Sequence, residues 1–418
     1  MTRQRPHILY VAEFATGGSI ESLLTLIGGL DKTEFDLTVL FFRMPEASIR
    51  ERMQQAGATV LSIDPGGPTE VVTRPPTRFN MQSRLRRVLG RRIEYAYASV
   101  KYALQYARFR LPTYRAIREQ LRVIQPDLVH FNNTVIADTA GIHAARTCGI
   151  PAISHVRNFG EITYLSVAIA RSVRVFVCIS NAVRDYLVDR GIDARRCVVI
   201  PNAVDLERFS EAETSPAAIR DEFGWNTTDK IFALVGRVVA WKGQEYFIRA
   251  IAKARESDAS IRGLIVGDDV ETGDSERYVA RLKSLIDELQ VGEAIRFTGH
   301  RTDVPNIMKA ADVVVCASSQ PEPFGRVIIE SMAVGTPVIA TDAGGATDII
   351  DDGKNGILVP IRNSDAMAEA MLRITSDVDF ELAVRKAGLR SITDHYTVAR
   401  HAAGITDLYR SVLGHDEI

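Results

Sequence analysis

Cysteine, long hydrophobic runs and net charge are all scarce in this sequence, and each scarcity excludes a class of protein. The 418 residues hold four isolated cysteines and no Cys-x-x-Cys pair, so a disulfide framework is excluded and buried free thiols in a reducing compartment are expected. No stretch reaches the ~18 apolar residues that span a bilayer, and no long hydrophobic region follows Met1. We therefore expect a cytoplasmic protein, either soluble or bound by its surface to the inner face of a membrane.

Net charge is nearly absent, with 51 Lys plus Arg against 52 Asp plus Glu, which argues against a protein that coats nucleic acid. The balance conceals one basic segment, residues 74–122, which holds 13 of the Lys and Arg residues and only two acids. Its core, residues 78–121, interleaves arginines with tyrosines, a composition that suits an anionic membrane surface or a lipid diphosphate acceptor. A solvated pair of helices is the alternative. No nucleic-acid motif accompanies the charge, so we expect no nucleic-acid partner.

Short apolar runs of the strand type alternate with helical patterns, which indicates parallel strands joined by crossover helices. The alternation is interrupted between residues 201 and 222, where Pro, Asn, Ser, Glu and Thr accumulate. We therefore predict an α/β protein with two doubly wound, Rossmann-like domains facing across a cleft, 1–202 and 203–392. A last helix lies within residues 393–418, and packing back on the N-terminal domain is one option for it. The expected strands are His7 to Phe14, Asp36 to Phe42, Leu128 to Phe131, Ala152 to His155, Val173 to Ile179, Cys197 to Pro201, Ile231 to Val235, Arg262 to Val266, Ala294 to Thr298, Val313 to Cys316, Pro337 to Ala340 and Gly356 to Val359.

Ligands of open parallel sheets collect beyond the carboxyl ends of the strands, so the loops that follow strands are where a site is expected. The first such loop carries Gly17 and Gly18 before a helix, whose N-terminal amides could hold an anion. A tight turn that simply needs glycine is the alternative. In the second domain, Arg237 and Lys242 flank one strand-to-helix loop and could both point at one diphosphate, although a solvated loop charge is the alternative for either residue alone.

The most informative loop runs from Ser318 to Glu330 and contains two glutamates eight positions apart. Pro321 and Pro323 hold Glu322 in extended backbone, whereas Glu330 lies in a helical pattern. The two carboxylates should therefore flank a helix N-terminus whose free N–H groups lie near Phe324, Gly325 and Arg326, an arrangement suited to a nucleotide sugar. A routine interaction of Glu330 with the helix dipole is the alternative.

These motifs resemble those of a known family. Glu-Pro-Phe-Gly at Glu322 to Gly325, continuing to Glu330, is similar to the Glu-x7-Glu motif of the retaining GT-B glycosyltransferases of the "family four" kind, the Glycosyl transferases group 1 domain. Four other segments of this chain resemble further signatures of that family and occur in the same order as in the family, so the resemblance covers almost the whole chain. They are Gly236-Arg237 with Lys242-Gly243, Val199 to Phe209, Phe297 to Arg301, and Val304 to Cys316.

The resemblance implies that a sugar moves from a nucleotide diphosphate donor to an acceptor hydroxyl with retention at the anomeric carbon. By position it assigns Arg237 and Lys242 to the diphosphate, Gly18 to the phosphate from the N-terminal side, Glu330 to the ribose, Glu322 with the backbone of Phe324, Gly325 and Arg326 to the sugar, and the backbone of Arg301 to the base. His155 resembles the family's histidine that contacts the transferring sugar, and a hydrogen-bonded residue at a strand end is its alternative. We expect attack on the face from which the phosphate leaves.

No cofactor or metal is expected. The only Asp-x-Asp triplet, Asp377 to Asp379, starts a helical segment and is typical of a helix cap, and Asp268-Asp269 is typical of a polar loop after a strand. Asn132, Asn133 and Arg157 are weaker candidates for contacts with an acceptor glycan or lipid-linked glycan of the cell surface. A nucleotide-sugar epimerase, a phosphorylase and a non-catalytic sugar-nucleotide-binding protein stay open as alternatives. The donor base and sugar, the acceptor and the oligomeric state are undetermined by the sequence.

Overall fold

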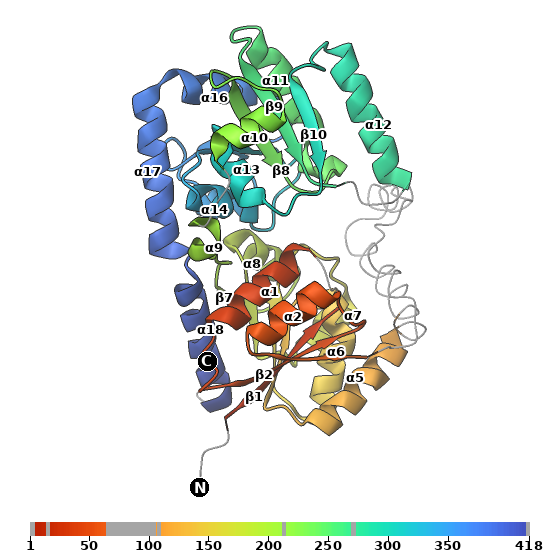
Figure 1. Cartoon of the computed structure of the whole chain (residues 1–418). Coiled ribbons are helices and arrows are strands. Elements are labelled where there is room, and N and C mark those ends of the chain that lie inside the picture. The colour runs from red at the N-terminus through yellow and green to blue at the C-terminus, as the bar shows by residue number, and fades with distance from the viewer. Residues whose placement is uncertain are drawn as a thin grey trace. The chain divides into compact units, whose positions relative to one another are not determined.

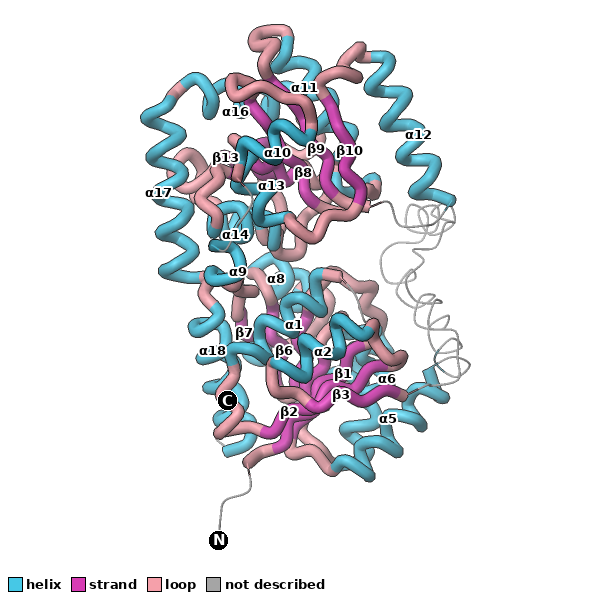
Figure 2. Tube along the Cα trace, in the orientation of Figure 1, coloured by secondary structure: helices cyan, strands magenta, loops and turns pink. Residues whose placement is uncertain are grey.

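The computed structural model describes residues 5–13, 17–63, 106, 110–210, 215–268 and 273–414. The chain divides into two compact units, Met1–Pro201 together with His401–Ile418 (unit 1) and Asn202–Arg400 (unit 2), as the colours of Figure 1 allow the reader to follow. Most of the basic segment expected at residues 74–122 lies outside the described residues. Each unit is built around one parallel β-sheet with helices packed on it (Figure 2), which confirms the predicted α/β class.

Unit 1 contains a seven-stranded sheet with the order β3-β2-β1-β4-β5-β6-β7, in which every pair is parallel. Its strands are β1 (His7–Ala12), β2 (Asp36–Phe41), β3 (Thr59–Ser62), β4 (Leu128–Phe131), β5 (Ala152–Val156), β6 (Val175–Cys178) and β7 (Cys197–Val199). The sequence analysis missed β3, because this edge strand is short and exposes its two end residues. The strands β1, β2, β4, β5 and β6 are largely buried and β7 is half-buried, and their apolar runs allowed the sequence pattern to locate all six to within a few residues.

The helices of unit 1 within the described residues are α1 (Gly18–Gly29), α2 (Ala47–Gln55), α5 (Leu111–Ile124), α6 (Val135–Cys148), α7 (Tyr164–Ala170), α8 (Asn181–Val188) and the turn η3 (Ala194–Arg196). The C-terminal helix α18 (Val398–Gly414) joins them through its buried face. Ala402, Ile405 and Tyr409 of that face belong to the same apolar cluster as the core residues of α1 and β1. The last helix of the chain therefore completes the core of the first unit.

Unit 2 contains a six-stranded parallel sheet with the order β10-β9-β8-β11-β12-β13. Its strands are β8 (Lys230–Val235), β9 (Ile261–Val266), β10 (Ile295–Gly299), β11 (Val313–Cys316), β12 (Val338–Thr341) and β13 (Ile357–Val359). Its helices within the described residues are α9 (Leu206–Ser210), α10 (Pro216–Glu222), the turn η4 (Ala240–Lys242), α11 (Gln244–Arg255), α12 (Gly273–Glu288), α13 (Val304–Ala310), α14 (Arg326–Ala333), α15 (Ala346–Ile349), α16 (Ser364–Ser376) and α17 (Val378–His395). Asp377 caps α17 by accepting a hydrogen bond from the Phe380 N–H, which confirms the predicted helix cap.

Three loops meet backbone to backbone at the carboxyl edge of the unit 2 sheet. A Cβ placed on Gly243, in the loop after β8, would lie 1.8 Å from the carbonyl oxygen of Ala317 in the loop after β11. On the other side of that loop, the Gly345 N–H donates to the carbonyl oxygen of Glu322 at 2.7 Å, and a Cβ on Gly344 would lie 2.1 Å from the same oxygen. Glycine is therefore required where these loops cross, because any side chain would separate them.

The cysteines are free, as the sequence analysis predicted, with Cys178 and Cys316 buried. Among the helices that the structure describes, none combines the length and the apolar character needed to cross a bilayer.

We predict that Gly243→Ala costs much more stability than Gly335→Ala. Both glycines have φ of 76°, so both variants carry the ~1–2 kcal/mol strain of a left-handed alanine. Nothing lies within 4 Å of a Cβ on Gly335, whereas the one on Gly243 collides with Ala317, and relieving such overpacking adds ~1–3 kcal/mol. Urea unfolding followed by tryptophan fluorescence measures this in unit 2, since both tryptophans, Trp225 and Trp241, lie there. Equal losses in the two variants would contradict the crossing.

Candidate functional site

The loop after β8 presents two cations of different character. Arg237 is exposed, and its guanidinium makes no hydrogen bond or ion pair with any residue that the structure describes. Its carbonyl oxygen accepts a hydrogen bond from Gln244 Nε2 at 2.9 Å, which holds the loop against the start of α11. Lys242 ends the turn η4, and its ammonium lies 4.2 Å from the ring centre of Trp241. One short loop thus supplies a free guanidinium and a positioned ammonium.

Lys242 forms an ion pair with Glu322 across two loops. Lys242 Nζ lies 2.6 Å from Glu322 Oε1, and the other carboxylate oxygen, Oε2, accepts a hydrogen bond from Ser318 Oγ at 2.6 Å. The side chains of the pair are 18% and 8% exposed, so the bond is largely shielded from water. Glu322 is further positioned by a parallel β-bridge to Gly344. The structure therefore brings together two of the predicted site residues, and it adds Ser318, which the sequence analysis did not assign.

The predicted helix N-terminus follows directly. Gly325, with φ of 96°, precedes α14, and Phe324 is buried beside it. Arg326 begins the helix, and its Nη2 lies 2.8 Å from Oε1 of Glu330, one turn further along. Glu322 precedes the helix and Glu330 lies in its second turn, so the two residues flank the first turn along the chain. Glu330 does not lie in the first turn itself, where an interaction with the helix dipole is strongest.

Arg301 uses its side chain to hold the loop after β10. Its Nη2 lies 3.0 Å from Glu222 of α10, and its Nε lies 2.8 Å from Asp303. Hydrogen bonds to these two carboxylates, Asp303 first and then Glu222, raise the pKa of Arg301. Within the described part of the chain, the main-chain N–H and C=O of Arg301 make no hydrogen bond. The side chain is thus structural, and the backbone is the part that has unused hydrogen-bonding capacity.

The weaker acceptor candidates lie together at the carboxyl edge of the unit 1 sheet. Arg157 Nε donates to Asn132 Oδ1 at 2.9 Å, and the Arg157 N–H donates to the Asn133 carbonyl oxygen at 2.8 Å. Asn132 Nδ2 donates to the carbonyl oxygen of Ser19 at the start of α1. Gly17, with φ of 91°, is the residue directly before α1, and Gly18 is the first residue of that helix. These residues come from the ends of β4 and β5 and from the start of α1.

Sequence reasoning missed a buried carboxylate, Glu13, at the same edge. Glu13 follows β1, and its Oε1 lies 3.3 Å from Nη1 of Arg110, with both side chains almost fully buried. Asn133 Nδ2 donates to the other oxygen of Glu13 at 3.5 Å. Burial raises the pKa of Glu13, and burial together with the charge of Glu13 raises the pKa of Asp138 well above its ordinary value. The position of Glu13 directly after a strand was the signal that could have found it.

His155 is buried inside unit 1. The strand does not end at this residue as expected, because β5 continues to Val156, and the ring of His155 lies between those of His130 and His401. Burial lowers the pKa of His130 and His155 well below the ordinary value, and it lowers the pKa of His401 to about 3. The Arg157 guanidinium is the second cause for all three. These imidazoles are therefore neutral at physiological pH.

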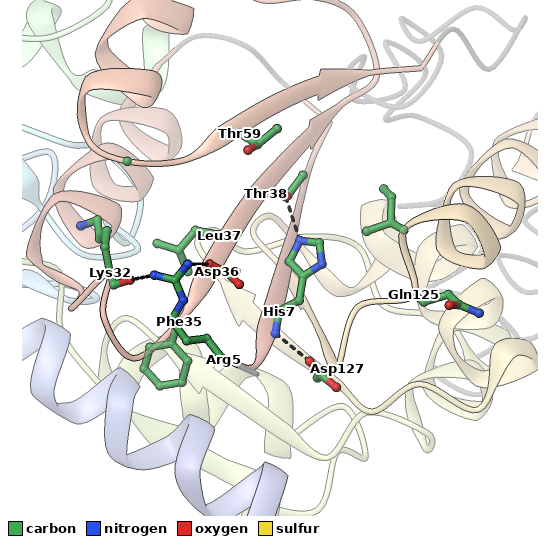
Figure 3. Close-up of a pocket in the computed structure, with 12 residues that line it drawn as sticks. Arg5, His7, Lys32, Phe35, Asp36, Leu37, Thr38, Thr59, Gln125 and Asp127 are labelled. Carbon is green, nitrogen blue, oxygen red and sulfur yellow. Dashed lines mark hydrogen bonds and ion pairs between the residues drawn. The ribbon is translucent and has the colours of Figure 1, made fainter. Parts of the chain in front are cut away.

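Unit 1 also has an open cavity that is not the candidate site. It has a volume of about 710 Å³ and lies at the amino ends of β1 and β2 (Figure 3), the edge of the unit 1 sheet opposite to the one that carries Glu13, Asn132 and Arg157. Its charged groups already have partners: Arg5 lies 2.7 Å from Asp36, and the His7 N–H donates to Asp127. None of the predicted site residues lines it. Within the described ranges, no group of three His, Cys, Asp or Glu side chains is arranged to hold a metal ion.

Two family models match this chain one after the other. The model described as Glycosyltransferase Family 4 matches residues 16–208, and the model described as Glycosyl transferases group 1 matches residues 216–390. The two stretches correspond to most of unit 1 and most of unit 2.

Similar proteins are found among both sequences and structures. D-inositol 3-phosphate glycosyltransferase of Corynebacterium urealyticum is 34% identical over 54% of this chain and 54% of its own length. UDP-Gal:alpha-D-GlcNAc-diphosphoundecaprenol alpha-1,3-galactosyltransferase of Escherichia coli is 25% identical over 68% of this chain and 75% of its own. The chain spans about half the length of the first curated relatives it matches.

The structure of Anabaena HepE, solved in complex with UDP and glucose, superposes with a TM-score of 0.77 over 97% of this chain and 100% of that one, at 21% identity. Sucrose-phosphate synthase of Thermosynechococcus elongatus gives 0.75 over 99% and 100%, at 19% identity. At this identity the likeness establishes the fold. With the two consecutive family models and the motifs at Arg237, Lys242, Glu322 and Glu330, it shows that the chain belongs to the group 1 glycosyltransferases and has their GT-B fold of two Rossmann-like domains.

Proposed function

We propose that this protein is a retaining glycosyltransferase that moves a sugar from a nucleotide diphosphate sugar to an acceptor hydroxyl. The observation that carries the proposal is the pairing of Lys242 with Glu322 beside the start of α14, because it places a shielded cation, a carboxylate and a helix N-terminus in adjacent loops. The relatives named above are glycosyltransferases, which supports the reaction class. The solved complexes of HepE with UDP and UDP-glucose make a uridine diphosphate sugar the first donor to test.

In this proposal the diphosphate is held by the loop after β8. A departing diphosphate gains negative charge as its bond to the sugar breaks, so cations that are already in position stabilise the transition state more than the ground state. Arg237 offers a guanidinium that has no counter-ion among the described residues. Lys242 is oriented in advance by Glu322 and Trp241 and needs little rearrangement. Arg237 and Lys242 would therefore together bind the diphosphate and stabilise it as it leaves.

The remaining donor contacts follow from the geometry of the neighbouring loops. Glu322 and the backbone of Phe324, Gly325 and Arg326 would bind the sugar, since a carboxylate accepts from hydroxyls and helix-start N–H groups donate to oxygens. Glu330 would bind the ribose hydroxyls, while its Oε1 contacts Nη2 of Arg326. The unused main-chain groups of Arg301 would bind the base.

The acceptor would bind in unit 1. Asn132, Asn133 and Arg157 lie together at the carboxyl edge of its sheet, Gly17 and Gly18 would face a phosphate, and His155 would contact the transferring sugar. We propose a glycan or lipid-linked glycan of the cell surface as acceptor, and the E. coli relative, which is named for a diphosphoundecaprenol-linked sugar, supports the lipid-linked form. The basic residues 78–121 would then attract an anionic inner membrane surface. The acceptor oxygen would attack the face from which the diphosphate leaves, and the leaving phosphate would take its proton.

Arg237→Ala should lower turnover by ~10²- to 10³-fold, the usual loss for one donor to a developing negative charge, while leaving the melting temperature unchanged because Arg237 is exposed and has no partner among the described residues. Arg249→Ala, on the exposed face of α11, is the matched control and should retain activity. Steady-state kinetics with UDP-sugars and a thermal melt measure both effects. Wild-type turnover in Arg237→Ala would refute the assignment.

Transfer should need no divalent metal. The cations proposed to stabilise the diphosphate are Arg237 and Lys242, so prolonged dialysis against EDTA should leave the initial rate unchanged. The check is the rate before and after dialysis, with and without added Mg²⁺ or Mn²⁺. A rate that is lost with EDTA and restored by one of these ions would show the expectation to be wrong.

The new glycosidic bond should keep the anomeric configuration of the donor, and no sugar should become covalently attached to the protein. Proton NMR of the transfer product gives the configuration of the new glycosidic bond, and intact-protein mass spectrometry during turnover detects any adduct. An inverted product would refute retention, whereas a retained product with a covalent sugar adduct would refute attack on the same face.

A further inference from the structure

A chain of buried hydrogen bonds links α18 to His155 inside unit 1. The hydroxyl oxygens of Tyr10, on β1, and Tyr409, on α18, lie 2.6 Å apart, and the Tyr409 oxygen lies 2.6 Å from Nδ1 of His130 on β4. His130 Nε2 in turn lies 3.3 Å from Nδ1 of His155 on β5. The planes of these two imidazoles are inclined by only 21°, which suits an N–H···N bond between ring edges. All four side chains are 0% exposed.

Each group in this chain is uncharged, so every bond has one donor and one acceptor. Burial raises the pKa of Tyr10 and Tyr409 and lowers that of His130 and His155, which keeps the phenols protonated and the imidazoles neutral. A neutral imidazole carries its proton on one nitrogen only. The direction of the first bond therefore determines the direction of all the others, and with it the tautomer of His155.

The chemistry of the groups selects one direction. A phenol O–H is a stronger donor than a neutral imidazole N–H, and an imidazole nitrogen is a stronger acceptor than a phenol oxygen, so Tyr409 donates to His130. His130 then carries its proton on Nε2 and donates to His155 Nδ1, which leaves the proton of His155 on Nε2. In the opposite direction the hydroxyl hydrogen of Tyr10 would have no acceptor among the described residues, in a position that water does not reach.

The far end of the chain has an unfilled hydrogen-bonding position. His155 Nε2 is buried and has no partner among the described residues, and the same holds for Nε2 of His401, whose ring centre lies 5.8 Å from that of His155. His401 Nδ1 lies 2.6 Å from the carbonyl oxygen of Pro201, which can only accept, so the proton of the neutral His401 is on Nδ1 and its Nε2 is an acceptor. A donor on His155 and an acceptor on His401 are the pair that a hydroxyl group satisfies, since it accepts and donates at once. An anionic oxygen is disfavoured there, because it would face the lone pair of His401 Nε2.

We propose that Tyr409 and His130 are positioning residues that hold His155 as its Nε2–H tautomer, so that His155 donates a hydrogen bond to a hydroxyl oxygen of the bound sugar while His401 accepts from a hydroxyl. The substrate part of this proposal rests on the proposed function, because it needs a sugar at His155. The tautomer part concerns the protein alone. Through this chain, the last helix of the sequence sets the donor character of a side chain on β5.

The tautomer is measurable without substrate. The full-length protein is labelled with ¹⁵N-histidine, long-range ¹H–¹⁵N spectra distinguish protonated from unprotonated ring nitrogens, and the signals missing from His155→Asn identify His155 among the eight histidines. We expect wild-type His155 to be entirely Nε2–H. Tyr409→Phe removes the donor to His130 and should yield a mixture of tautomers. A wild-type His155 protonated on Nδ1, or a Tyr409→Phe variant with an unchanged tautomer, overturns the proposal.

Tyr10→Phe is the matched control. It makes the same substitution in an equally buried tyrosine and breaks the same Tyr10–Tyr409 bond, but it leaves Tyr409 to donate to His130. Its His155 should remain Nε2–H, and the melting temperatures of the two variants should fall similarly. A mixture of tautomers in both variants would mean that loosened packing, and not the donor of Tyr409, determines the tautomer, which also overturns the proposal.

Turnover then tests the substrate part separately. In Tyr409→Phe, kcat should fall in proportion to the lost Nε2–H fraction, with the KM for the acceptor unchanged. The test uses a series of nucleotide-sugar analogues, each lacking one sugar hydroxyl. Wild type should turn over one of these analogues much more slowly than the parent sugar, whereas His401→Phe should turn over that analogue and the parent sugar at similar rates. If no analogue behaves so while transfer proceeds, the hydroxyl contact is wrong and the glycosyltransferase stands. If no donor is turned over while the tautomers are as expected, the proposed function fails and the hydrogen-bond chain stands.

Discussion

The contact on which the candidate donor site depends is the crossing of the loops after β8 and β11, where Gly243 leaves no room for a side chain above the carbonyl of Ala317. This close approach brings Lys242 within 2.6 Å of Glu322, and the Gly344–Gly345 backbone holds Glu322 from the other side. Burying two charges is expensive, and their mutual attraction recovers the cost only with good geometry and further hydrogen bonds, here from Ser318. The pair is therefore better understood as a positioned group than as a source of stability.

Unit 1 shows the same separation between a packed interior and a polar edge. Most residues of its parallel strands are apolar, and the polar residues Glu13, Asn132, Asn133 and Arg157 follow strands or end the sheet, where backbone and side chains from several strands converge. The buried rings of Tyr10, His130 and His155 are exceptions inside the strands. They are tolerated because each, apart from the free end at His155 Nε2, has a hydrogen-bond partner.

Much of the fold was predictable because buried parallel strands are continuous apolar runs. The strand β11 was located to the residue, and β8 and β9 to within one residue at their start. The edge strand β3 escaped because half-exposed residues carry no such pattern. Among site residues, Lys242 and Glu322 were found from their motifs, whereas Ser318 and Glu13 were not, because a lone serine or glutamate after a strand is common and only its partners make it notable. Their roles toward a substrate stay predictions.

The sequence by itself determined the elements and the family, since apolar period, turn residues and the Glu-x7-Glu spacing are properties of neighbouring positions along the chain. Only the tertiary structure decided which distant residues meet. Tyr409 and His401 lie about 250 to 280 positions after their partners His130 and His155 in the chain. The local pattern of an amphipathic helix shows that it has a buried face, but it does not indicate which strands that face will cover. That choice follows from the complementarity of two buried surfaces, which exists only once both elements have formed and packed.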